Sequence, residues 1–355
     1  MTTVHVVVPG GIDDPLRPSG GNVYDRRVCH GLAVDGWSVH EHAVPGRWPR
    51  PDQAGGATLA RVLGGIADQA LVLLDGLVAS AVPEVLGAES GRLRLVVLVH
   101  LPLGADPSGD GGPDARTRER TALSAATAVV ATSGWARRWL LDRYALPADR
   151  VHVVEPGVDI ADISPGTTRG GELLCVGAVT PVKGFDVLVA ALAGVQDRAW
   201  HCVCVGSLDL DAGFVGGVRG QAEDTGIVDR VRFVGPLTGT ELERAYAEAD
   251  LLVLGSRVET YGMVVTEALA HGLPVVATNV GGVSEALGRA PDGSRPGLLV
   301  RPGDPPAFAA ALRSWLDDPD RRELLRRAAQ ARRPTLSGWP NTARRMSRVL
   351  TGVAG

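Results

Sequence analysis

The sequence has almost no lysine and no long hydrophobic run. Lys183 is the only lysine, and every other residue among the 36 basic ones is an arginine. No segment approaches the roughly 18 consecutive apolar residues that a membrane-spanning helix needs. The N-terminus lacks the basic opening of a signal peptide and is instead typical of a first strand. We therefore expect a cytoplasmic protein without a transmembrane segment.

The sequence also lacks a recognisable cysteine motif and an excess of positive charge. The four cysteines show no metal-binding or disulfide spacing. Cys202 and Cys204 alternate with valines, as buried residues of a strand do. The net charge is −4, whereas a dedicated nucleic-acid-binding protein usually carries a basic domain. We expect neither a disulfide framework nor a nucleic-acid partner.

Length and hydrophobic patterning together predict the fold class. With 355 residues, the chain exceeds what one hydrophobic core usually organises, so two domains are expected. Short apolar runs alternate with helical patterns, which indicates βαβ units and parallel sheets. Strands are predicted at 4–8, 38–42, 70–74, 95–99, 128–131, 151–154, 172–176, 201–205, 231–234, 250–254, 274–277 and 298–300. Helices are predicted, among others, at 22–35, 77–88, 114–126, 134–143 and 341–351.

A segment rich in glycine and proline separates the two halves of this pattern, between 155 and 171. We therefore predict an α/β protein of two Rossmann-like, doubly wound parallel-sheet domains, residues 1–160 and 170–338, facing a central cleft. Doubly wound sheets bind ligands beyond the carboxyl ends of their strands. Chemistry is accordingly expected in the loops that follow strands.

Two features of the first domain fit such a site. Gly20 and Gly21 precede a helix, where adjacent glycines let backbone N–H groups approach an anion. A plain strand-to-helix turn explains the glycine pair equally well. His100 follows the fourth predicted strand and should point into the cleft, although a structural histidine is an equally good interpretation.

The second domain carries the stronger pattern. Lys183 follows its first strand, where an ammonium suits a departing diphosphate. A later strand leads into an apolar helix whose first amides can cradle a phosphate. Glu259 and Glu267 bracket that anion site, so we expect them to accept hydrogen bonds from hydroxyl groups. A capping glutamate and a surface glutamate are the alternative. The candidate ligand-binding residues here are Lys183, Glu259, Thr260, Tyr261, Gly262, Met263 and Glu267.

A metal-dependent sugar transferase would need a D-x-D motif in its own fold. Asp209 and Asp211 have this spacing, but no other part of the sequence fits that fold, so they are assigned to an ordinary loop. No metal site is predicted.

Together these residues resemble the large family four of retaining glycosyltransferases, which have the GT-B fold. The E-x7-E motif of that family matches Glu259 to Glu267. The similarity covers nearly the whole chain, and it implies that the last helix, within 339–355, packs back onto the first domain. Further matching features are Gly20-Gly21, His100, Pro156-Gly157-Val158-Asp159, Lys183-Gly184 and Gly281-Gly282 with Glu285.

The resemblance implies a function. A hexose would pass from a nucleotide diphosphate sugar, UDP- or GDP-linked, to a hydroxyl acceptor, with retention and without a metal or other cofactor. Lys183 would contact the donor phosphates, Glu259 the hydroxyls of the transferred sugar and Glu267 the ribose. The amides of 261–263 and of the Gly20-Gly21 pair would complete the diphosphate site, with His100 near the reacting carbon. One departure is Ala178, where the family usually has a phosphate-binding arginine.

Other interpretations remain open. An epimerase or hydrolase could use the same donor, and Ala178 is compatible with a catalytically silent nucleotide-sugar-binding protein. A nicotinamide dehydrogenase is disfavoured because the G-x-G-x-x-G motif is absent. The acceptor, whether a small molecule, a glycan or a lipid-linked sugar, would be selected by the loops around 10–22 and 101–113. The segment 135–139 could touch a membrane surface, although a packed helix is the simpler interpretation. The donor base and the oligomeric state are not specified by the sequence.

Overall fold

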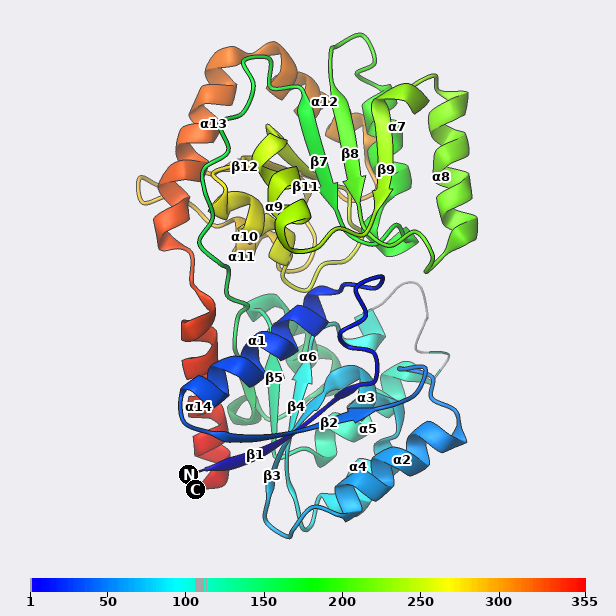
Figure 1. Cartoon of the computed structure of the whole chain (residues 1–355), viewed down its shortest axis with the longest axis vertical. Helices are drawn as coiled ribbons and strands as arrows, with labels where there is room; N and C mark the ends of the chain where they lie inside the picture. The colour runs from blue at the N-terminus through cyan, green and yellow to red at the C-terminus, as the bar shows by residue number, and fades with distance from the viewer. Residues whose placement is uncertain (1, 106–111, 113) are drawn as a thin grey trace. The chain divides into compact units, whose positions relative to one another are not determined.

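The computed structural model describes residues 2–105, 112 and 114–355 (Figure 1). The chain divides into two compact units. Unit 1 comprises Met1–Asp14, Gly20–Gly157 and Ser337–Gly355, and unit 2 comprises Pro15–Ser19 and Val158–Leu336. Each unit contains one six-stranded parallel sheet with helices around it. The predicted α/β fold with two parallel-sheet domains is therefore confirmed.

The sheet of unit 1 has the strand order β2-β1-β3-β4-β5-β6. All of its predicted strands are confirmed to within two residues at each end. The strands are β1 (Thr3–Pro9), β2 (Ser38–Val44), β3 (Leu71–Asp75), β4 (Arg94–Val99), β5 (Ala128–Ala131) and β6 (Val151–Val153). The helices are α1 (Gly20–Val34), α2 (Gln53–Gly64), α3 (Gly76–Ala81), α4 (Pro83–Glu89), α5 (Ala115–Ala125), α6 (Gly134–Tyr144) and α14 (Trp339–Ala354).

Two helices of unit 1 differ from the prediction. The single helix expected at 77–88 is two helices, α3 and α4, because Pro83 begins α4. Proline is favourable at the first position of a helix but interrupts the hydrogen bonds of a helix interior. Helix α2 was not predicted. Residues 106–111 and 113, within the predicted acceptor loop 101–113, lie outside the described residues.

The sheet of unit 2 has the order β12-β11-β10-β7-β8-β9. Its predicted strands are likewise confirmed. The strands are β7 (Glu172–Val176), β8 (His201–Val205), β9 (Val231–Gly235), β10 (Leu251–Leu254), β11 (Val275–Thr278) and β12 (Gly297–Val300). The helices are α7 (Phe185–Ala193), α8 (Ala212–Asp224), α9 (Gly239–Glu248), α10 (Met263–Ala270), α11 (Val283–Leu287), α12 (Pro305–Asp317) and α13 (Pro319–Arg332).

Continuous apolar strands explain why helices cover both faces of the unit 2 sheet. Successive side chains of a strand point to opposite faces. In β10, Leu251 and Val253 belong to a buried cluster with α7, α8 and α12. The alternate residues Leu252 and Leu254 belong to a second cluster with α9, α10 and α11. The run of leucine and valine thus builds a three-layer unit.

The last helix packs within unit 1, where α14 lies beside α1 (Figure 1). The Trp37 indole donates to the Ser347 hydroxyl at 2.9 Å, and the Thr342 hydroxyl donates to the Glu155 carbonyl at 2.9 Å. At Gly157, a Cβ atom would lie 2.4 Å from the backbone nitrogen of Trp339. Glycine therefore permits the close approach that brings the last helix to this unit.

The described residues contain no helix with the length and hydrophobicity that a bilayer crossing requires. The possible membrane-contact segment forms part of α6, where Trp135 and Trp139 are partly buried against the core of unit 1. Arg137 of the same helix donates to the carbonyls of Val151 and Ala148. These contacts favour the interpretation of this segment as a packed helix.

Each sheet reverses the direction of its strand order at one point. In unit 1 the first strand, β1, lies between β2 and β3, and in unit 2 the first strand, β7, lies between β8 and β10. The loops that leave such neighbouring strands diverge to opposite faces, and ligands of doubly wound sheets bind there. The candidate site residues follow β1 and β4 in unit 1, and β7 and β10 in unit 2.

Candidate functional site

Two loops of unit 2 are in direct contact at the reversal point of its sheet. One follows β7 and ends at Gly184, and the other follows β10 and begins at Gly255. Gly184 has φ +64°, and a Cβ atom there would lie 2.1 Å from the carbonyl oxygen of Gly255. Glycine is therefore required at 184 on two grounds, its backbone angle and the space available.

This contact brings together two of the predicted site residues. The Lys183 Nζ donates to the Glu259 Oε1 at 2.6 Å. The Ser256 hydroxyl donates to the same oxygen at 2.9 Å. The Glu259 side chain is only 9% exposed, whereas that of Lys183 is 30% exposed. The ammonium can consequently meet a ligand in solution while the carboxylate stays fixed.

The glycine pair at 281 and 282 supports the backbone of the Glu259 loop. A Cβ atom at Gly281 would lie 1.7 Å from the carbonyl oxygen of Glu259. The Gly282 N–H donates to that same oxygen at 2.9 Å. The sequence pattern singled out these glycines, and their contact with the loop explains why larger residues would displace it.

Helix α10 follows this loop. It begins at Met263, and Gly262 precedes the helix with φ +93°. No side-chain hydrogen bond caps this end of the helix. The first backbone N–H groups of a helix have no partner within it, and the helix dipole favours an anion beside them. The arrangement suits a phosphate group.

Glu267 lies on α10, and its hydrogen-bond partner was not predicted from the sequence. The Tyr246 hydroxyl, from α9, donates to the Glu267 Oε2 at 2.7 Å. Burial raises the pKa of Glu267, and the hydrogen bond from Tyr246 opposes that rise. A fully buried tyrosine hydroxyl requires a partner. Tyr246 therefore orients the carboxylate of Glu267, the residue predicted to bind the ribose.

Arg257 has a structural role in the same unit. Its two terminal nitrogens donate to the Asp186 carboxylate at 2.8 and 2.6 Å, and one of them also donates to the Pro181 carbonyl at 2.6 Å. Burial raises the pKa of Asp186, but Arg257 outweighs it and the net shift is downward. Arg257 is therefore held against Asp186 and the loop that follows β7.

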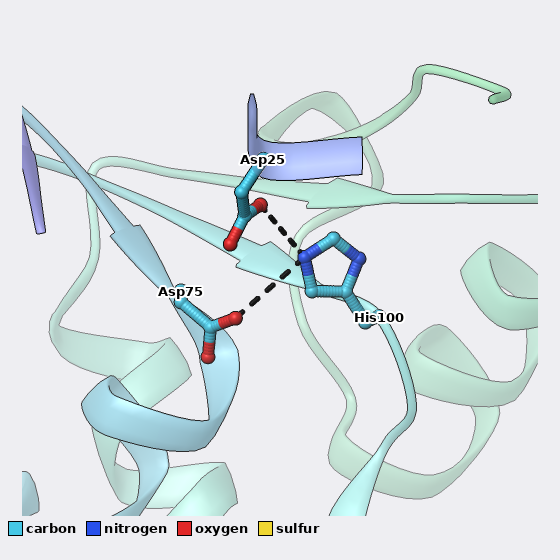
Figure 2. A group of neighbouring side chains, drawn as sticks. All are labelled: Asp25, Asp75 and His100. Carbon is cyan, nitrogen blue, oxygen red and sulfur yellow. Dashed lines mark hydrogen bonds and ion pairs between the residues drawn. The ribbon is translucent and has the colours of Figure 1, made fainter. Parts of the chain in front are cut away.

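In unit 1, His100 directly follows β4 and faces two carboxylates (Figure 2). Its Nε2 lies 2.8 Å from the Asp25 Oδ1 and 3.6 Å from the Asp75 Oδ2. Asp25 belongs to α1, whereas Asp75 ends β3 and accepts a hydrogen bond from the Leu77 N–H at 2.6 Å as the cap of α3. The sequence analysis missed both aspartates. Asp75 could have been identified from the sequence, because it is a carboxylate at the end of an apolar strand.

The predicted glycine pair, Gly20 and Gly21, opens α1 rather than preceding it, and Gly21 packs against the same histidine. Gly21 lies in the first turn of α1, and a Cβ atom there would be 3.2 Å from the His100 Cδ2. The edge of the Tyr24 ring meets the imidazole with centroids 5.3 Å apart. The structure thus brings together Gly21 and His100, two of the residues predicted from sequence in this unit.

The charges of Asp25, Asp75 and His100 influence one another. Burial, with a further contribution from the Asp25 charge, raises the pKa of Asp75 to about 7. Burial alone would lower the pKa of His100, but Asp25 and Asp75 outweigh it and raise that pKa. Carboxylates and imidazoles also bind divalent cations, and the three sets of ligand atoms lie within 4.8 Å of one another. The 2.8 Å contact is the length of a hydrogen bond. The absence of a metal requirement stays a prediction.

Comparisons with known families match almost the entire chain. Residues 3–162 match the family described as "Glycosyltransferase Family 4". Residues 165–332 match the family described as "Glycosyl transferases group 1". The first match covers most of unit 1, and the second falls within unit 2.

Curated relatives and solved structures agree with these matches. The chain is 34% identical to the D-inositol 3-phosphate glycosyltransferase of Salinispora tropica over 64% of its length, and to that of Thermomonospora curvata, also at 34%, over 66%. These matches span 51% and 59% of the two relatives.

The solved structures similar to this chain include sucrose-phosphate synthase from Thermosynechococcus elongatus, with a TM-score of 0.80 at 22% identity over 99% of both chains. The Anabaena protein Alr3699/HepE in complex with UDP-glucose has a TM-score of 0.79 at 17% identity, over 99% of this chain and 100% of that one. These structures share the fold of the chain.

Proposed function

The chain belongs to the GT-B glycosyltransferases of the family-four type, and on that premise we propose that it transfers a hexose from a nucleotide diphosphate sugar to a hydroxyl acceptor. The transfer retains the configuration of the sugar and needs no metal. The observation that carries the proposal is the Lys183–Glu259 pair, which follows the two strands at the reversal point of the unit 2 sheet. Helix α10, with Glu267 on it, continues from the same loop.

Under this proposal, each candidate site residue of unit 2 has a defined role. Lys183 and the N-terminus of α10 stabilise the negative charge that develops on the departing diphosphate. Glu259 accepts hydrogen bonds from hydroxyls of the transferred sugar, and Glu267 accepts them from the ribose. UDP is the first nucleotide to test, because the Anabaena structure of the same fold contains UDP-glucose.

The bond changes balance without a cofactor. The acceptor oxygen bonds to the anomeric carbon on the face from which the diphosphate leaves. The carbon–oxygen bond to the diphosphate breaks, and its electron pair stays on the phosphate oxygen. The acceptor proton moves to that oxygen. His100 of unit 1 assists by contacting the transferred sugar, as the family resemblance implies.

A catalytically silent nucleotide-sugar-binding protein is the second candidate. It is favoured by Ala178, which leaves the family's usual arginine position without a cation, and by Arg257, which is bound to Asp186. Such a protein would bind the donor and transfer nothing.

One assay separates these functions. The protein is incubated in EDTA with UDP-glucose or GDP-mannose, with and without an acceptor set that includes D-inositol 3-phosphate, the compound named in the relatives. We expect a glycoside of unchanged anomeric configuration only when an acceptor is present. Donor cleavage without acceptor would identify a hydrolase, a changed donor sugar an epimerase, and binding without turnover the silent protein.

Replacement of Glu259 tests the division of tasks within unit 2. We expect Glu259→Ala to lower kcat/KM for transfer about 10²-fold, while the Kd for UDP changes by less than about threefold, because UDP carries no hexose for Glu259 to hold. Isothermal titration and initial rates measure the two effects. An equal loss of UDP binding would contradict the assignment of Glu259 to the sugar.

Tyr246→Phe tests the ribose assignment of Glu267. Loss of the hydroxyl that orients this carboxylate should weaken UDP binding about fivefold, the cost of about 1 kcal/mol for one hydrogen bond. Binding of a 2′,3′-dideoxy analogue of UDP should not change, because it offers no hydroxyls to Glu267. Tyr144→Phe is the matched control, since the Tyr144 hydroxyl donates to the buried Glu119 in unit 1. Equal weakening for both ligands would contradict the ribose assignment.

A further inference from the structure

We propose that Asp25 and Asp75 are positioning residues that hold His100 as an imidazolium, so that its Nδ1–H donates a hydrogen bond to the ligand of unit 1. The assignment concerns the charge and orientation of His100. Only its kinetic consequence rests on the proposed glycosyl transfer.

The orientation follows from the contacts of the ring. The Nε2 faces both carboxylates, at 2.8 Å from Asp25 and 3.6 Å from Asp75. Figure 2 shows the other ring nitrogen on the side away from the two acids. Gly21 packs against the ring, and Tyr24 meets it edge-on. The ring is therefore held with its Nε2 toward the acids and its Nδ1 directed away from them.

The charge follows from burial. The side chains of Asp25 and Asp75 are 4% and 3% exposed, and that of His100 is 15% exposed. The Asp25 Oδ2 is buried, and among the described residues it has no hydrogen-bond donor. Two carboxylates in such a place cannot both remain ionised without a compensating positive charge. A protonated His100, whose Nε2 faces both carboxylates, supplies that charge.

Among the residues that the structure describes, the Cys29 thiol of α1 also interacts with the Asp25 charge, and burial raises its pKa to about 12, which keeps it neutral. Besides Asp25, helix α1 offers the Tyr24 hydroxyl, which donates to the Val154 carbonyl at 2.9 Å and whose pKa burial holds well above its usual value. From β3 the facing group is Asp75. The influence of the acid pair raises the pKa of His100, in the direction that the proposal requires.

The protonation state decides what His100 can do. A neutral imidazole that donates from Nε2 to Asp25 presents a lone pair at Nδ1, which can only accept a hydrogen bond. An imidazolium presents an N–H at Nδ1 instead. The acid pair therefore sets whether His100 donates a hydrogen bond to an oxygen of the ligand or can only accept one from it. The ligand expected is one with an acceptor oxygen, such as a sugar hydroxyl or a phosphate.

Nuclear magnetic resonance tests the charge directly. The full chain, labelled with ¹⁵N-histidine, contains 8 histidines, and the His100 signals are identified by their absence in His100→Gln. In the unsubstituted protein at pH 7.0, in EDTA, we expect both His100 nitrogens to show imidazolium shifts. In Asp25→Asn the midpoint of the His100 titration should fall by more than one pH unit, and in Asp75→Asn by less, since Asp75 is farther from the ring.

A second histidine of the same chain, His271, serves as the internal control for the NMR measurement. The His271 Nε2 contacts Glu243 at 2.9 Å in unit 2, and its signals should be unchanged in both variants, which also shows that they are folded. A neutral His100 in the unsubstituted protein at pH 7.0 overturns the proposal without any variant. An unchanged titration in a folded Asp25→Asn protein, or selective broadening of the His100 signals by added Mn²⁺, which would indicate a metal site, also overturns it.

The kinetic consequence separates this proposal from the proposed function. If His100 must be protonated for transfer, kcat/KM falls as pH rises through its pKa, and this alkaline limb shifts to lower pH in Asp25→Asn. A charged His100 without transfer from any donor would refute the function and leave the charge assignment intact. Transfer at full rate with a neutral His100 would refute the inference and leave the function intact.

Discussion

Lys183→Ala is expected to lower kcat/KM for sugar transfer by 10²- to 10³-fold, roughly the effect of removing one preorganised electrostatic contact to a transition state. The reason is that a diphosphate gains negative charge as it leaves, and Lys183 is the cation that the structure holds beside Glu259. The fold should persist, because Ser256 still donates to the Glu259 carboxylate. Initial rates and circular dichroism measure the two outcomes.

Two further variants make the Lys183 experiment specific. Lys183→Arg keeps the positive charge and should recover part of the lost activity, although a guanidinium has a different shape. Arg244→Ala removes a positive charge from an exposed pair with Glu248 in the same unit and should leave the rate unchanged. Near-normal turnover by Lys183→Ala would contradict the role of this residue.

Asp250→Ala is expected to produce the largest loss of stability, about 3–5 kcal/mol, as when one partner of a buried ion pair is removed. The Asp250 side chain is 0% exposed and pairs with Arg326 at 2.7 Å. It also accepts hydrogen bonds from the Thr167 hydroxyl at 2.6 Å and the Glu172 N–H at 2.9 Å. These contacts tie the segment that enters unit 2 to β7, β10 and α13. Urea denaturation of the full chain measures the change.

The matched control is Asp317→Ala. Asp317 also pairs with an arginine, Arg198, but both side chains are 38% exposed. Exposed ion pairs contribute little to stability because water screens them, so the urea midpoint should be unchanged. A midpoint for Asp250→Ala equal to that of the control would show that the buried pair does not hold unit 2 together.

Much of the fold could be predicted because its strands are continuous runs of valine and leucine bounded by glycine, proline or polar residues. A run such as 95–99 is buried on both faces, which is typical of a parallel sheet. Helix boundaries were less predictable. Proline at 83 is compatible with either a kink or a new helix, and α2 begins at an Asp52 cap in a segment rich in glycine, so its apolar periodicity is weak.

The site was predictable where topology alone determines position. His100, Lys183 and Glu259 follow strands, and parallel strands deliver their carboxyl ends to one edge of a sheet. Asp25 and Tyr246 were missed because each acts from a helix through a contact with a residue distant in sequence, 75 and 21 positions away. Side-chain contacts between residues so far apart in the sequence depend on how the helices pack, and no local sequence pattern indicates that. For the same reason the engagement of Arg257 with Asp186 could not be foreseen.

The most direct test of the central claim is calorimetric titration of the full chain with UDP, GDP, ADP and dTDP, in EDTA and again with magnesium. The account predicts that one nucleotide binds clearly, with the same Kd in both conditions, and that Lys183→Ala weakens this binding. Failure of all four nucleotides to bind, or binding only with magnesium, would contradict the claim that unit 2 holds a nucleotide diphosphate sugar through Lys183 and the α10 N-terminus.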